Sequence, residues 1–93
     1  MRFKSENQLR EYWEKERKKF QDEFLNRVEK EGKTKEDERV KQVMELYFNL
    51  FLVNELESIC QLYKEENRYR TDVEVSRHFE CVLKPVLEIM WKG

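Results

Sequence analysis

The sequence predicts an all-α protein of three helices, and two observations lead to that prediction. Only two glycines and one proline interrupt the 93 residues, whereas a β-sandwich or barrel needs turn residues about every 8–12 positions. Apolar residues make up 39% of the chain and aromatic residues 13%, which is enough for a folded core although 42% of residues are charged. Because chains of this length rarely divide, we expect residues 1–93 to form a single helical domain.

Residues that start and end helices divide the chain into three segments. Three polar residues can each cap a helix start, and each is followed three positions later by a side chain able to bond back: Ser5 with Gln8, Thr34 with Asp37, and Thr71 with Glu74. Gly32 can end the first helix in a left-handed conformation, and residues 67–70 form a polar connector. We therefore predict helices over about 6–31, 35–66 and 72–91.

The first helix is predicted to be amphipathic. Its apolar residues recur in steps of three, four and seven and form one face: Leu9, Trp13, Phe20, Phe24 and Val28. Acidic and basic residues four positions apart, such as Glu23 and Arg27, cover the other face. This pattern is typical of a helix with one buried and one solvated side.

The second helix is unusually apolar in its middle. From Val43 to Val53 only Glu45 and Asn49 are polar, and a helix that is apolar all round is expected to be buried all round. A helix over 35–66 would be roughly 48 Å long, against a diameter near 32 Å for a compact chain of this size. We therefore expect this central helix to overhang, bend or be shared with another chain.

The third helix contains the only proline. Val75, Phe79, Val82 and Val86 are predicted to form its buried line, while Leu87 and Trp91 fall outside that line as surplus apolar surface. Pro85 removes one N–H and crowds the carbonyl four residues earlier, so we expect a kink near residue 85 or a split into a fourth helix.

The residues that could carry chemistry are few, and we predict no catalytic site, no bound cofactor and no metal. His78 is the only histidine; with Cys81 and Glu74 it has a spacing that permits metal binding but does not require it. The two glycines form no phosphate-binding loop. Cys60 and Cys81 lie in apolar surroundings and are expected to be buried free thiols in a reducing compartment. We therefore predict a non-enzymatic protein.

Charge and hydropathy limit the partners and the location. Nineteen basic and twenty acidic residues leave a net charge of −1, which gives no overall attraction to nucleic acid or to anionic membranes. No apolar run approaches the roughly 20 residues of a membrane span, and the N-terminal residues lack the apolar stretch of a secretory signal. We therefore expect a cytoplasmic protein with no membrane association.

Residues 71–90 support a second hypothesis. The order of Val75, Ser76 and Phe79, with a turn near Glu80, resembles the spacing of a helix-turn-helix. The resemblance implies a small DNA-binding regulator, whose contacts to DNA would come from Arg70, Arg77 and Lys84. It departs from the motif at Glu80, where glycine is usual, and in the apolar residues of its recognition helix.

The favoured hypothesis is a helical protein–protein interaction or assembly module, with an antiparallel bundle completed by a dimer or higher oligomer or by another helical protein. Asn49 could fix the register of a coiled-coil-like interface, lie at the edge of the buried face, or contact a ligand. Trp91 is expected either to anchor in a groove on another subunit or beside the central helix, or to cap the chain's own core between the first two helices. The candidate interface residues are Asn49, Phe48, Leu52, Leu87, Met90 and Trp91.

Overall fold

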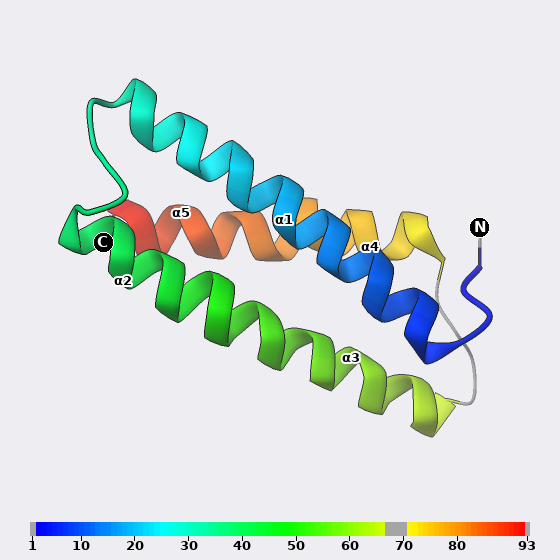
Figure 1. Ribbon diagram of the computed structural model, residues 1–93. Helices are drawn as coiled ribbons and strands as arrows, with labels where there is room; N and C mark the ends of the chain where they lie inside the picture. Colours follow the sequence, from blue (N-terminus) through cyan, green and yellow to red (C-terminus); the bar gives the residue numbers. More distant parts are fainter. Residues whose placement is uncertain (1, 67–70, 93) are drawn as a thin grey trace.

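The computed structural model describes residues 2–66 and 71–92, which form three continuous helical runs (Figure 1). The first run is α1 (Glu6–Lys30). The other two each contain a central π-helical segment: the second run is α2 (Glu38–Val43), η1 (Met44–Phe51) and α3 (Leu52–Glu66), and the third is α4 (Asp72–His78), η2 (Phe79–Leu83) and α5 (Lys84–Lys92). No strand occurs in these residues, and the all-α prediction is confirmed.

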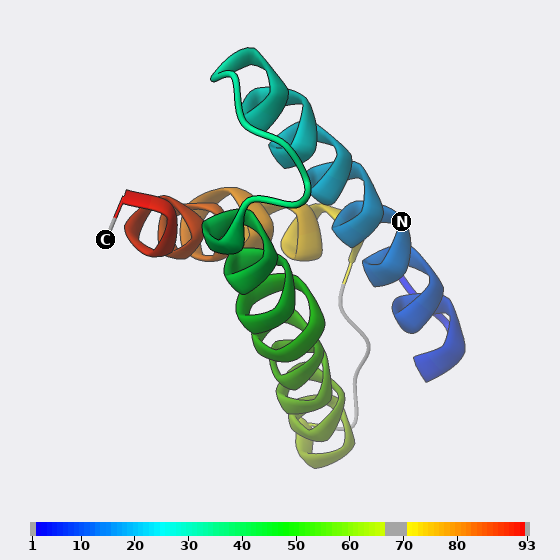
Figure 2. The same ribbon diagram turned by 60° about the vertical axis from the view of Figure 1, so that its left-hand side comes forward.

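Successive runs point in opposite directions along an elongated molecule. In Figure 1 α1 passes from right to left, the α2–α3 run returns, and the α4–α5 run passes back to the left. Figures 1 and 2 show the α2–α3 run lying close to α5 at its start and diverging from the α4–α5 run toward its end, where Glu57 and Lys64 form ion pairs with Arg10 and Glu6 of α1. The molecule extends 45 × 20 × 20 Å, so the long second helix is accommodated by the shape of the whole chain.

Side-chain caps define the helix starts, and one of them differs from the prediction. Ser5 accepts a hydrogen bond from the Gln8 backbone N–H, and Thr71 accepts one from the Glu74 N–H, as expected. The second helix begins at Glu38 and not at residue 35, because the Asp37 carboxylate caps it by accepting from the backbone N–H groups of Arg39 and Val40. The predicted connector 67–70 lies outside the described residues.

Gly32 ends α1 as the sequence predicts. Its φ of +79° is left-handed. The Gly32 N–H donates to the Glu29 carbonyl and the Lys33 N–H donates to the Val28 carbonyl, which together form a Schellman motif.

Replacing Gly32 by alanine is expected to lower the free energy of unfolding by about 1 kcal/mol, because an alanine Cβ is unfavourable at positive φ. No atom lies within 4 Å of where that Cβ would be, so the cost comes from the backbone conformation and not from a clash. Urea denaturation measures the change. Lys30→Ala, two residues earlier on the exposed surface, is the control and should be nearly neutral. A Gly32→Ala protein of unchanged stability would contradict the left-handed assignment.

The π-helical segments change which residues are buried. A π turn contains an extra residue, which shifts every later side chain around the helix axis. The buried line of the third run is therefore Val75, Phe79, Leu83, Leu87 and Trp91, in steps of four. The predicted line was wrong at Val82, which is 46% exposed, and Leu87 and Trp91 are core residues and not surplus surface.

Pro85 does not split the third helix. The residues on both sides of it are helical, so no fourth helix forms. The π-helical η2 segment ends at Leu83, two residues before Pro85, and the Lys84 N–H donates to the Phe79 carbonyl, five residues back. A turn widened in this way is an established way for a helix to accommodate a local disruption.

Candidate interaction surface

Four of the six residues predicted for an interface lie inside the chain's own core. Phe48 and Leu52 are fully buried, and Leu87 and Trp91 are 2% and 8% exposed. Phe48 packs against Phe20 and Phe24 of α1, with ring centroids 5.7 and 5.6 Å apart. A surface for another chain must therefore use other side chains.

Trp91 packs between the first and second runs. Its ring meets that of Phe24 edge-on at 5.3 Å, its Nε1 donates to Glu31, and the Lys33 ammonium lies 4.6 Å from its ring centroid. The Arg39 guanidinium donates to the carbonyl oxygens of Met90 and Trp91. These contacts correspond to the second of the two predicted placements, in which Trp91 caps the chain's own core.

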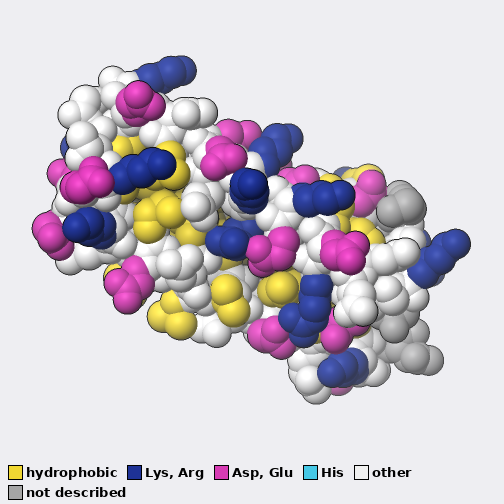
Figure 3. Space-filling view, viewed as in Figure 1, with side chains coloured by type: hydrophobic (Ala, Val, Ile, Leu, Met, Phe, Trp, Pro, Cys, Tyr) yellow, Lys and Arg dark blue, Asp and Glu magenta, His cyan; other side chains and the backbone are white. Residues whose placement is uncertain are grey.

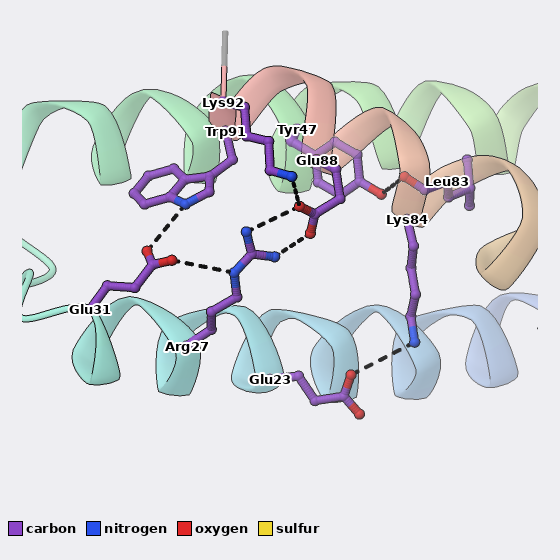
Figure 4. Close-up of polar contacts among 9 residues, drawn as sticks. All are labelled: Glu23, Arg27, Glu31, Tyr47, Leu83, Lys84, Glu88, Trp91 and Lys92. Carbon is purple, nitrogen blue, oxygen red and sulfur yellow. Dashed lines mark hydrogen bonds and ion pairs between the residues drawn. The ribbon is translucent and has the colours of Figure 1, made fainter.

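Ion pairs hold α5 to α1 (Figure 4). Arg27 binds both carboxylate oxygens of Glu88, and this hydrogen bonding lowers the pKa of Glu88. Lys84 reaches Glu23 at 3.8 Å and Glu80 at 2.6 Å. Burial disfavours the charged form of Lys84, but the hydrogen bond to Glu80 and the nearby carboxylates raise its pKa. The side of α5 that carries Lys84 and Glu88 therefore faces α1.

Three contacts fix the alignment of the second and third runs. The buried Tyr47 hydroxyl donates to the Leu83 carbonyl, and burial raises the Tyr47 pKa. Near one end of the pair Glu55 meets His78 at 3.3 Å. Near the other end Arg39 binds the Trp91 carbonyl. Because the two runs are antiparallel, the numbers of two residues that lie side by side have nearly the same sum at every position along the pair. Leu50 therefore lies beside Val82, and Leu46 lies beside Val86.

One face of this helix pair points away from α1. Successive residues are about 100° apart in an α-helix and somewhat less in a π-helix, so residues two positions apart lie on roughly opposite sides of either. Phe48 contacts α1, and Leu46 and Leu50 are each two positions from it. Lys84 also contacts α1, and Val82 and Val86 are each two positions from it. We call this the distal face: Leu46, Leu50, Val82, Val86, Ile89 and Met90.

The distal face is apolar and largely exposed. Leu46, Leu50, Val82 and Ile89 are 50%, 53%, 46% and 72% exposed, while Val86 and Met90 are partly buried against the core. It also lacks charge: residues 46–54 contain no charged side chain, and the only two between 81 and 91, Lys84 and Glu88, reach α1. In a chain with 42% charged residues, this is an unusual surface.

A second apolar feature lies between α1 and the start of the second run. Two adjoining hollows of about 580 and 550 Å³ share Leu25 and Lys35, and Val28, Val40 and Met44 supply apolar lining. Figure 3 shows hydrophobic side chains there among lysines and acidic residues. Asn49 is exposed at this groove, which places it outside the core.

The histidine and the cysteines form no combined site. His78 is paired with Glu55. Cys60 is a buried free thiol whose pKa is raised by burial, whereas Cys81 is exposed, which corrects the prediction that both are buried. Within residues 2–66 and 71–92, no three His, Cys, Asp or Glu side chains are arranged to hold a metal ion.

The described residues do not form the helix-turn-helix predicted to contact DNA. The turn predicted near Glu80 is wrong, because Glu80 lies within the continuous helix of α4, η2 and α5. Lys84 is engaged with Glu80 and Glu23. Arg77 is exposed, and Arg70 lies outside the described residues. The helix-turn-helix geometry is therefore not formed.

Sequence reasoning missed Leu46, Leu50, Val82 and Ile89 as surface residues. It treated the run around Leu46 as buried on all sides and assigned Val82 to the core. The absence of charge from residues 46–54 was the available sign of an unusual surface, but locating that surface required the alignment with the third run.

Comparison with known proteins gives no match: no family model fits the chain, and no significant similarity was found to a curated protein or a solved structure. Among the described residues, none of the helices has both the length and the apolar character needed to span a bilayer.

Proposed function

We propose that this chain is a non-enzymatic helical assembly module, an antiparallel bundle that is completed by binding a second copy of itself. The observation that carries the proposal is the distal face, where large apolar side chains remain about half exposed and no charged side chain intervenes. Contiguous exposed apolar surface of this kind is typical of protein–protein contact sites.

The area that assembly would cover is energetically sufficient. Burying even a few hundred Å² of apolar surface per chain favours association by roughly 10 kcal/mol before the entropy of association is subtracted. The free state of both cysteines is compatible with the predicted cytoplasmic location, where thiols remain reduced.

Light scattering coupled to size exclusion tests the proposal. We expect a species of at least twice the 11.7 kDa chain mass at micromolar concentration, with dissociation on dilution. Because the contact is apolar, moderate salt should leave the mass unchanged. A monomer throughout the micromolar range would contradict self-assembly.

A further inference from the structure

The distal face presents apolar side chains from two neighbouring helical runs. Leu46 and Leu50, one turn apart, form a ridge on the second run, and Val82 and Ile89 project from the third. Val86 and Met90 of the third run are partly buried against the core and continue the apolar surface. Helices pack by placing the side-chain ridges of one partner into the grooves of the other.

The distribution of charge suits pairing of this face with itself. In a two-fold contact the same surface patch meets its own copy, so a charged residue near the axis would face a like charge. The level of Leu50 and Val82, at the middle of the face, has no charged side chain directed to it, since Lys84 is held by Glu80 and Glu23. Self-pairing therefore meets no repulsion at its centre.

The size of the face also agrees with a dimer. Its exposed leucine, valine and isoleucine side chains amount to on the order of 400 Å² of apolar surface, a size at which such patches are often functional. A standard interface buries about 800 Å² per partner, of which somewhat more than half is apolar. The apolar face together with the polar side chains around it supplies an area of about that size on each copy.

We infer that two copies of this chain pair through their distal faces about a two-fold axis near Leu50 and Val82, so that two helices from each copy pack together as four. This inference rests on the proposed self-assembly, and it specifies which surface forms the contact and the symmetry that relates the two copies. A two-fold contact closes at two copies, whereas a head-to-tail contact between different surfaces would add further copies.

Charge substitutions on the two helices test the surface. Leu50→Lys and Val82→Lys each place an ammonium group at the centre of the contact, and each is expected to weaken the dimer at least about tenfold. Val73→Lys is the matched control, because Val73 is 57% exposed in the first turn of α4, outside the distal face. The control should assemble like the unmodified chain, and all three should keep their helical circular dichroism because the replaced side chains are exposed.

The outcomes separate this inference from the function on which it rests. A monomeric unmodified chain overturns the self-assembly itself. If both Leu50→Lys and Val82→Lys leave the dimer intact, the distal face is not the contact surface. If the mass grows beyond that of two chains with increasing concentration, the contact is not two-fold symmetric. If a lysine variant unfolds, Leu50→Ser and Val82→Ser replace it; they should weaken the dimer severalfold, and unchanged assembly would again overturn the face.

Discussion

Replacing Trp91 by alanine is expected to lower the free energy of unfolding by about 3 kcal/mol, a cost typical of removing a large aromatic side chain from a core. The substitution removes the ring contact with Phe24, the hydrogen bond to Glu31 and the cation–π contact with Lys33. Chemical denaturation at one fixed protein concentration measures the loss, since the stability of an assembling protein depends on concentration.

Val73→Ala is the control for Trp91→Ala. Val73 is 57% exposed and lies outside the distal face, so its truncation should change the free energy of unfolding by less than about 0.5 kcal/mol. The opposite pattern, in which Trp91→Ala abolishes assembly but leaves the monomer as stable as before, would support the alternative placement of Trp91 in another subunit.

Truncation of Tyr47 to alanine is expected to be more damaging still, at about 4 kcal/mol. Its ring is fully buried and packs against Phe20, Phe48 and Phe51. Tyr47→Phe keeps the ring but leaves the buried Leu83 carbonyl without the hydroxyl donor, for a loss of about 1–2 kcal/mol. Thermal and urea unfolding of the two variants would separate the contribution of packing from that of the hydrogen bond.

The stability of the protein at alkaline pH gives an independent test of the burial of the Tyr47 hydroxyl. Burial raises the pKa of Tyr47 in the folded chain, whereas in the unfolded chain it ionises near its usual pKa of about 10. The stabilisation by neutral Tyr47 is complete below that pH and is lost as the pH rises above it. Tyr47→Phe should therefore lose less stability than the unmodified chain between about pH 9 and 11.

Much of the local structure could be predicted because its causes are local. The Ser5 and Thr71 caps and the left-handed Gly32 depend on residues within one turn, and the structure has all three. The five buried residues of α1 are the five predicted from spacing, because α1 is a regular α-helix whose side chains keep one period. At the second start the prediction named Thr34 as the cap and was wrong, because Asp37, three residues later, makes the cap.

The surface could not be predicted in the same way. No proline or glycine marks the π-helical segment η1, so nothing in residues 44–51 shows that the helical period changes there. The prediction for the third helix assumed one period throughout and therefore placed Val82 inside and Trp91 outside.

The sequence by itself determined the all-α class, the number of helices, and most of their starts and ends, since capping, glycine conformation and amphipathic spacing act within a few residues. Only the tertiary structure decided which side of the second and third helices is covered. That choice depends on contacts between residues far apart in the chain, such as Tyr47 with Leu83 and Arg39 with Trp91. Such contacts set the rotation of one helix against another, and the side chains left outside, Leu46, Leu50, Val82 and Ile89, follow from that rotation.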